Sequence, residues 1–252
     1  MIRFEDQAGL RVVTLDRPDK RNALTPDMLC DLYGAFMFRG DAQSAVRAVL
    51  LRGEGPVFCS GFDLDLCQDD GPEQQMMRTF LISLSEVVKQ MRRSPVPVVL
   101  AAHGAAIAGG CALLGGADVV VAERGAKLGY PVVRLGISPA VSAPFLLDAV
   151  GPGPARRRLL DPTLFDGAEG ARIGLVHELV EERGEVAPRA HEIARDLASK
   201  PPLAMKATKK WVLEVAGEAK MEGRAARALD ASVSLVAGDE AIERLQGLWK
   251  TR

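Results

Sequence analysis

The sequence lacks the features that mark several classes of protein. It has four cysteines, three histidines and no C-x-x-C pair, so a zinc site is not expected. No apolar run approaches the roughly 18 residues of a membrane-spanning helix, and the first ten residues, MIRFEDQAGL, contain no apolar signal core. Basic residues number 32 against 33 acidic ones, which disfavours nucleic acid as a partner. We therefore expect a cytoplasmic protein with reduced thiols that binds no metal, membrane or nucleic acid.

The composition is that of a folded globular protein. Of the 252 residues, 48% are hydrophobic and 26% are charged. This length suits one large domain, or a core with a small appendage.

Short apolar segments and helical patterns alternate along the first two-thirds of the chain. A helix is expected from Thr25, a good N-cap before Pro26, toward Arg39. Apolar spacing predicts a second helix over 73–93, and an almost all-helical tail begins near 185 with a break at Pro201-Pro202. Strands or extended segments are expected over 11–18, 47–55, 57–64, 96–104, 117–123, 127–139 and 175–180. The pattern predicts an α/β body with a C-terminal helical region.

Two glycine-containing turns, each after an extended segment, are the most informative feature. They are GPVFCSGFDL (55–64) and AAHGAAIAGGCAL (101–113). In the second, glycines leave the backbone without side chains where a helix begins, and the first N–H groups of a helix have no partner within it. Such N–H groups suit the binding of a substrate oxygen that becomes negative during a reaction. Taken alone, Gly-Gly before a helix is more often a packing or turn device.

Several blocks in the same order resemble the crotonase family, also called the enoyl-CoA hydratase/isomerase family. They are RPDKRNALTPDML at 17–29, GEGPVFCSGFDL at 53–64, VPVVLAAHGAAIAGGCALLGGADVVVAERGAKLGYP at 96–131, LGISP at 135–139, GARIGLVHELV at 170–180 and EAIERLQGLWK at 240–250. The resemblance implies a crotonase-like spiral of ββα units over 1–195 and a C-terminal helical trimerisation region over 196–252. It also implies homotrimers or hexamers, and a coenzyme A thioester as substrate or ligand with no permanently bound cofactor.

The resemblance also assigns roles to single residues. It places an oxyanion hole on the backbone N–H groups of Phe62 and Gly109. Phe62 stands where the family commonly has a small residue, so its ring adds bulk beside the thioester. The residues that the resemblance places along the CoA moiety or substrate are Lys20, Arg21, Ala23, Ser60, Asp63, Leu64 and Pro131.

The sequence departs from the family at two positions. The resemblance places the two hydratase glutamates at Ala112 and Val132, and neither side chain can transfer a proton. The usual two-glutamate hydration is therefore not expected. Decarboxylation of a carboxyacyl-CoA needs stabilisation of the resulting enolate more than it needs a base. Lyase chemistry of this kind is therefore possible without the two glutamates. Isomerisation would need a base that the sequence does not identify. The alternative is a catalytically inactive acyl-CoA-binding or oligomer-partner protein.

Other polar residues leave alternatives open. Tyr130 could approach the pocket mouth, and its ordinary pKa near 10 suits a hydrogen-bond donor better than a base. Arg134 could pair with a substrate carboxylate, although an exposed arginine is the simpler interpretation. His103 is expected to make a structural hydrogen bond. Ser60 lacks a G-x-S-x-G motif and a neighbouring histidine, which disfavours a serine hydrolase. The run Arg156–Arg158 is expected on a solvated helix face.

Overall fold

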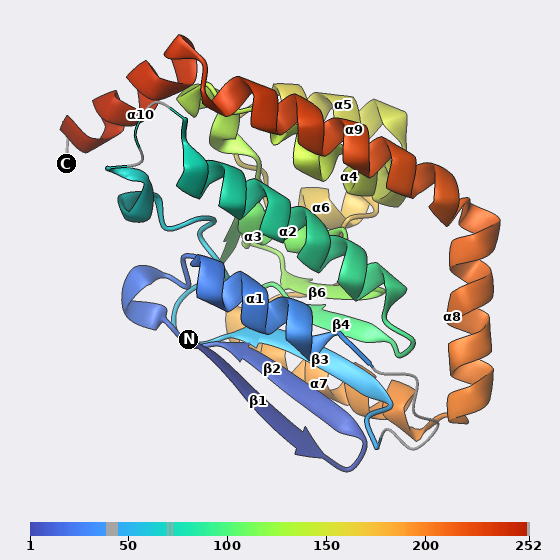
Figure 1. The fold of residues 1–252 in the computed structure, drawn as a ribbon. Coiled ribbons are helices and arrows are strands. Elements are labelled where there is room, and N and C mark those ends of the chain that lie inside the picture. Colours follow the sequence, from blue (N-terminus) through green and yellow to red (C-terminus); the bar gives the residue numbers. More distant parts are fainter. Residues whose placement is uncertain (39–44, 70, 72, 251–252) are drawn as a thin grey trace.

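The body of the protein is a mixed sheet whose strands come from the first 180 residues. The structure is a computed structural model, and it describes residues 1–38, 45–69, 71 and 73–250. In the described residues the sheet has six strands in the order β1-β2-β3-β4-β6-β8. β1 (Ile2–Gln7) and β2 (Leu10–Leu15) form an antiparallel hairpin. The parallel strands β3 (Ala48–Gly53), β4 (Val98–Ala101) and β6 (Val119–Glu123) follow, as Figure 1 shows, and β8 (Glu178–Val180) pairs with β6.

A small second sheet carries one of the two glycine turns. It pairs β5 (Ala105–Ile107) with β7 (Lys127–Gly129) in parallel. β5 leads through Ala108 into the short helix α3 (Gly109–Leu114). β7 leads into the 3₁₀ helix η3 (Pro131–Leu135), which is followed by a second one, η4 (Pro139–Ser142).

Helices cover both faces of the main sheet. On one face lie α1 (Pro26–Ala35) and α2 (Gln75–Arg93), which pack on each other and on the core. On the other face, α7 (Arg183–Ser199) places a row of small residues, Ala190, Ala194 and Ala198, against Leu50 and Val99 of the sheet. The strands are therefore apolar on both sides, as expected of a covered parallel sheet.

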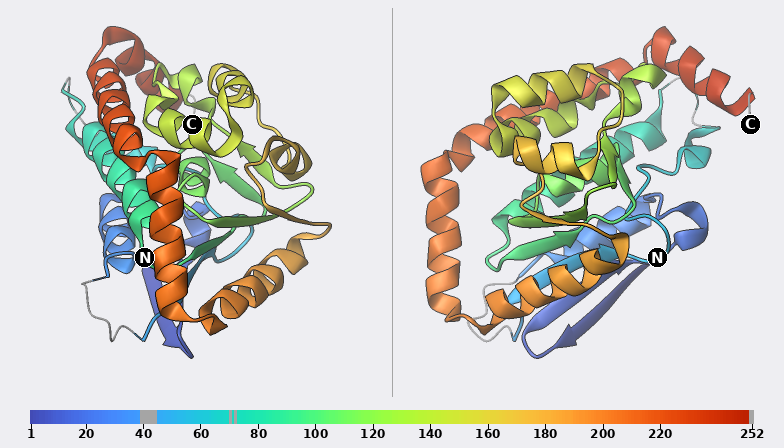
Figure 2. Two further views of the ribbon diagram at one scale, coloured as in Figure 1. Left: turned by 90° about the vertical axis from the view of Figure 1, so that its right-hand side faces the viewer. Right: turned by 180° about the vertical axis from the view of Figure 1, so that it is seen from behind.

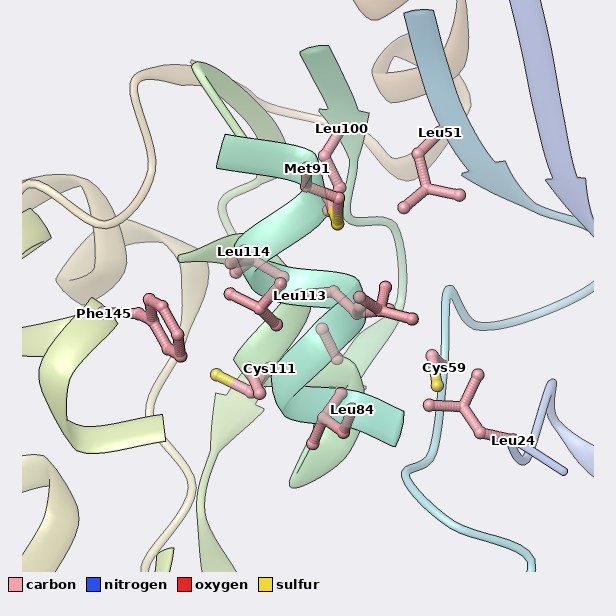
Figure 3. Packing of buried hydrophobic residues seen from close by; sticks show 14 of the residues in the cluster. Leu24, Leu51, Cys59, Leu84, Met91, Leu100, Cys111, Leu113, Leu114 and Phe145 are labelled. Atoms are coloured by element: carbon pink, nitrogen blue, oxygen red, sulfur yellow. The ribbon is translucent and has the colours of Figure 1, made fainter. Parts of the chain in front are cut away.

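Shorter helices close the end of the body that carries the second turn. They are α4 (Ala143–Val150), α5 (Pro152–Leu160) and α6 (Gly167–Ile173). Figure 3 shows how this region joins the core: Cys111 and Leu113 of α3 lie among Leu84 of α2 and Phe145 of α4. Because every residue of α3 is buried, the core fixes the position of this helix and of the turn at Ala108 that precedes it.

The C-terminal region consists of three helices that bridge the two faces of the molecule. α8 (Pro202–Ala216) runs from the end of α7 to the start of α9 (Glu218–Val236), and α10 (Asp239–Lys250) follows (Figures 1 and 2). Lys209 of α8 is buried and donates to Asp118 at 2.6 Å, which fixes α8 to the end of the sheet. α9 lies along α2 and η4, and α10 contacts η3.

The α/β body with a C-terminal helical region is confirmed, whereas several predicted element bounds change. The hairpin strand β1 was not predicted, and the expected extended segment 57–64 contributes only single bridges before the 3₁₀ helix η2 (Leu64–Cys67). α1 ends at Ala35, and Arg39, toward which it was expected to run, lies outside the described residues. The predicted break at Pro201-Pro202 is confirmed, since α7 ends at Ser199 and α8 begins at Pro202.

Candidate functional site

The two glycine turns meet at an apolar cavity of about 260 Å³. Its wall comes from the 60–64 loop, α2, the start of α3, η3 and η4. Two titratable side chains, Tyr130 and Arg134, occur among the described residues that line it, and no carboxylate or imidazole does. The lining residues are Ser60, Phe62, Leu64, Met77, Leu81, Leu84, Ile107, Ala108, Gly109, Tyr130, Pro131, Val132, Arg134, Leu135, Ile137, Ser138, Pro139, Val141 and Ser142.

Two isolated β-bridges hold the first turn in place. Cys59 pairs with Ala106 of β5, and Phe62 pairs with Leu24. In the second bridge, the N–H of Leu24 donates to Gly61 O at 2.8 Å, and the N–H of Asp63 donates to Leu24 O at 2.9 Å. Since backbone groups alternate in direction along an extended chain, the N–H of Phe62 points away from Leu24. Within the described residues it donates to no protein acceptor.

The second turn abuts the first at Gly61. Gly61 has a φ of +100°, and a Cβ at this position would lie 3.2 Å from Ala108 Cβ and 3.7 Å from the Gly109 nitrogen. A glycine is therefore required for the two turns to approach this closely. This contact places Gly61, the residue before Phe62, next to the N–H of Gly109, the first residue of α3.

Ala108 holds the N–H of Gly109 in a strained turn. Its φ of 52° and ψ of −114° are rare for a residue with a side chain, and such strain is commonly stored at functional sites. The Ala108 N–H donates to Gly129 O at 2.8 Å, which ties the turn to β7. Gly109 is the first residue of α3, so its N–H has no acceptor in the helix, and none is found elsewhere in the described chain.

The side chain of Phe62 lies beside the second donor. Its ring stacks on Phe80 of α2, with centroids 4.6 Å apart and planes 13° from parallel. A Cβ on Gly109 would come 3.1 Å from Cε1 of this ring. The ring is therefore packed against the turn that presents the Gly109 N–H, and it forms part of the cavity wall.

The two positions at which the resemblance implies glutamates differ in their surroundings. Val132 lies in η3 and lines the cavity. Ala112 is 2% exposed, belongs to the core cluster, and is not among the described lining residues. The N–H of Ala112 donates to Ala108 O at 2.9 Å, so its backbone supports the strained turn.

Tyr130 lines the cavity, but its hydroxyl is turned into the protein. The hydroxyl donates to the carbonyl oxygen of Cys111 at 3.3 Å. Burial, with a further contribution from Cys111, raises the pKa of Tyr130 well above its ordinary value. Burial likewise raises the pKa of Cys59 to about 12 and of Cys111 to about 11, so neither thiol is a ready nucleophile.

The residues predicted to lie along CoA fall into two groups. Ser60, Leu64 and Pro131 line the cavity. Lys20, Arg21 and Ala23 belong to the 17–24 loop, and Arg21 O accepts from the Ser60 N–H at 3.1 Å, which places this loop beside the first turn. Their role toward CoA stays a prediction.

Asp63 forms an ion pair within the site. Its carboxylate is 2.6 Å from Arg17 Nη1, and it also accepts from the Asp65 N–H. Arg17 donates to Ala23 O as well. The carboxylate of Asp63 is thus engaged in fixing the loop around Phe62.

Asn22 is a supporting residue that the sequence did not reveal. It is fully buried, and its side chain accepts from the Arg17 N–H at 2.9 Å. It also donates to Glu54 O at 2.8 Å and to Val57 O at 2.9 Å. The first bond lies within the 17–24 loop, and the other two join this loop to residues 54 and 57 at the first turn. An asparagine with a positive φ, here 53°, is a usual sign of such a turn, but its distant partners cannot be read from sequence.

His103, for which a structural hydrogen bond was expected, and two further polar residues have structural contacts. His103 shares a hydrogen bond with Gly55 O at 3.0 Å, and burial lowers its pKa. His177 Nδ1 accepts from the Val120 N–H. Glu123 accepts from the Gly104 N–H at 2.8 Å. None of these three side chains is among the described residues that line the cavity.

The arginines differ from one another in their surroundings. Arg134 is exposed, lines the cavity, and forms no ion pair within the described chain. The prediction of a solvated face for the 156–158 run is wrong for Arg158. It is 5% exposed, pairs with Glu169 and lies over the ring of Phe165 at 4.4 Å. Its partners, Phe165 and Glu169 of α6, lie on the segment that follows α5.

The described residues contain neither a metal-binding cluster nor a helix suited to a membrane. No group of three or more of their His, Cys, Asp or Glu side chains is arranged to hold a metal ion. None of the described helices combines the length and the apolar character that crossing a membrane requires.

The fold and the site together define an α/β protein in which two tight turns present free backbone N–H groups at an apolar cavity. The family model described as enoyl-CoA hydratase/isomerase matches residues 5–242, and the chain belongs to this family. A putative enoyl-CoA hydratase of Thermus thermophilus is 31% identical over 221 residues, which is 86% of each chain. The short-chain-enoyl-CoA hydratase of Clostridium acetobutylicum is 32% identical, over 83% of this chain and 79% of that one.

Solved structures agree with the fold. The structure of Pseudomonas aeruginosa OdaA superposes with a TM-score of 0.84 at 30% identity, covering 98% of both chains. That of an enoyl-CoA hydratase from Bacillus halodurans gives a TM-score of 0.85 at 26% identity, covering 98% of this chain and 99% of that one. The crotonase-like fold predicted from the sequence is confirmed.

Proposed function

We propose that the protein binds the thioester carbonyl of an acyl-CoA between the N–H groups of Phe62 and Gly109 and stabilises the enolate formed there. One observation supports the proposal: Phe62 and Gly109 lie on adjoining turns, both line the same apolar cavity, and neither backbone N–H has an acceptor within the described residues. Fixed donors in a water-poor site stabilise a developing negative charge strongly, because they need no reorganisation during the reaction.

The reaction that best fits these groups is decarboxylation of a carboxyacyl-CoA. The bond between the α-carbon and its carboxylate breaks, CO₂ leaves, and the electron pair becomes an enolate whose oxygen accepts from the two N–H groups. A proton from solvent water then adds to the α-carbon. No enzyme base is needed, which agrees with a cavity wall without carboxylate or imidazole among its described residues.

Hydration and isomerisation fit less well, because each needs a proton carrier. The side chains at positions 112 and 132 are alanine and valine. Tyr130 keeps its proton in the bond to Cys111 O, and its raised pKa makes it a poor base.

The CoA portion is proposed to leave the cavity past Ser60, Leu64 and Pro131. The Lys20–Asp65 pair, at 3.2 Å, is exposed on the neighbouring loop. An exposed pair of this kind is weak, so Lys20 is able to exchange its partner for a CoA phosphate. Backbone atoms of the 20–24 loop would supply the remaining contacts.

A second candidate function is that of an acyl-CoA-binding protein without turnover. The dry wall formed by Val132, Leu135 and Ile137 favours it as much as it favours decarboxylation. The two functions share the binding step and differ only in whether the bound thioester then reacts.

A panel of acyl-CoAs tests both. Isothermal titration calorimetry with neutral and carboxylated thioesters measures binding, and mass spectrometry of the recovered thioesters detects loss of CO₂. Binding with loss of CO₂ supports the lyase, and binding without any change in the thioesters supports the non-catalytic protein. If no thioester binds, the proposed function is wrong.

We also propose that α8 contributes to a homotrimer or a hexamer. This helix exposes large apolar side chains: Leu203 is 79% exposed, Trp211 61% and Val215 80%. Apolar surface of this kind is typical of a contact between copies. Light scattering coupled to gel filtration measures the mass, and a monomer would contradict this assignment. The cytoplasmic location stays a prediction.

A further inference from the structure

The ring of Phe62 occupies the part of the cavity where an acyl chain must begin. The Phe62 backbone N–H and the Gly109 N–H define where the carbonyl oxygen lies in the proposed function. The ring edge approaches Gly109, since a Cβ there would lie 3.1 Å from Cε1 and 3.4 Å from Cδ1. An acyl chain attached to that carbonyl therefore runs next to the ring.

The ring is not free to move aside. It stacks on Phe80, which is fully buried in the core, with a centroid distance of 4.6 Å. The backbone on its other side is held by the bridge to Leu24, which is also fully buried. The wall is thus preformed, and a ligand has to fit it.

The space beyond the ring is small. The cavity measures about 260 Å³, below the range of about 300–1,000 Å³ that ligand pockets usually span. Its lining includes Met77 and Leu81 of α2, and both are buried in the core. With the ring in place, the cavity has room for a short acyl group only.

We propose that the side chain of Phe62 determines specificity by restricting the protein to short acyl chains, separately from the role of its N–H. The inference rests on the proposed function, because it needs a thioester carbonyl between the two donors. The substrate class is then a short-chain acyl-CoA. Replacing the ring by a methyl group would open the space in front of Phe80 and leave the N–H in place.

The test compares chain-length profiles. Dissociation constants are measured by calorimetry for straight-chain saturated acyl-CoAs of increasing length with the wild type, Phe62→Ala, Phe62→Leu and Leu66→Ala. Leu66→Ala is the matched control, because Leu66 is an exposed residue of η2 that does not line the cavity. We expect wild-type affinity to rise with length and then to fall when the chain exceeds the cavity.

Phe62→Ala should move this maximum to longer chains. Each methylene group newly admitted should tighten binding about fourfold, which is the roughly 0.8 kcal/mol of one buried CH₂, so two give about fifteenfold. Phe62→Leu should fall between the wild type and Phe62→Ala, and it keeps the test decisive if Phe62→Ala does not fold. Leu66→Ala should match the wild type.

The outcomes separate the two proposals. Wild-type binding with an identical profile in both Phe62 variants contradicts the role of the ring and leaves the proposed function standing. Absence of binding by the wild type to every acyl-CoA contradicts both. A shift of equal size in Leu66→Ala would also contradict the inference, because the effect would not belong to the cavity.

Discussion

The backbone N–H of Gly109 can be removed by proline, and the structure supplies a matched control. Gly109 is the first residue of α3, a position at which proline fits a helix because the N–H there has no helical partner. Gly109→Ala keeps the N–H and adds only a Cβ, 3.1 Å from the ring of Phe62. The difference between the two variants therefore reports the donor, with the steric effect of the Cβ common to both.

The expected effects on binding and on turnover differ in size. A neutral carbonyl in the ground state loses one ordinary hydrogen bond, about 0.5–1.5 kcal/mol, or about two- to twelvefold in Kd. An enolate oxygen loses one of its two donors, which costs about 10²–10³ in kcat. If decarboxylation occurs, Gly109→Pro should therefore reduce kcat much more than it weakens binding, relative to Gly109→Ala.

Calorimetry and a CO₂-release assay measure the two quantities on the same preparations. Thermal unfolding is needed beside them, because a proline restricts the residue before it, and Ala108 already has a φ of 52°. Both variants should unfold at a lower temperature than the wild type, with Gly109→Pro the lower of the two. If folded Gly109→Pro binds and turns over the thioester as well as Gly109→Ala does, Gly109 is not an oxyanion donor.

Three further predictions concern charge and support. Arg134→Gln should weaken binding of a carboxylated acyl-CoA but not of a neutral one of equal length, because Arg134 lines the cavity and forms no ion pair within the described chain. Calorimetry measures both affinities, and equal effects on the two ligands would contradict this prediction. Asn22→Ala should lower the free energy of unfolding by about 3 kcal/mol, since the fully buried Asn22 side chain loses three hydrogen bonds. Urea denaturation measures this free energy, and a loss below about 1 kcal/mol would refute the prediction. Hydrogen bonds from Arg172 and Arg158 lower the pKa of Glu169 to about 2. The stabilisation by the ionised Glu169 carboxylate is therefore complete above about pH 4.5 and is lost as the pH falls toward 2. Over this interval the urea midpoint of the wild type should fall with pH, and that of Glu169→Gln should fall less. An equal fall in both proteins would contradict the assignment.

The sequence predicted best those elements whose pattern is local. The apolar spacing over 73–93 gave α2, which the structure places at Gln75–Arg93, because the side chains that repeat along it are the ones it buries. β1 was missed because Ile2 is its only buried residue. That strand forms by pairing with β2 across Ala8 and Gly9, whose φ values of 51° and 85° make a tight hairpin turn.

The candidate site was predictable in its backbone and not in its side chains. The two glycine-containing turns were recognised from the sequence, and the structure brings them together at Gly61 and Gly109. The position of the Phe62 ring could not be predicted, because it depends on Phe80, which lies on a separate helix. The burial of Arg158 was likewise invisible, since its partner Glu169 belongs to the next helix.

In the proposed site, the same two backbone N–H groups bind the carbonyl and stabilise the enolate. The donors are backbone groups, and they are held by Gly61, by the turn at Ala108 and by the Arg17–Asp63 pair. None of these supports uses the side chains at positions 112 and 132. A fold shared with enoyl-CoA hydratases does not by itself establish hydration, because chemistry follows the side chains that a fold carries. Ala112, at 2% exposed, packs into the core, and its methyl group has no proton to transfer. The alanine and valine at positions 112 and 132 are therefore compatible with the proposed decarboxylation, which needs no proton carrier from the protein.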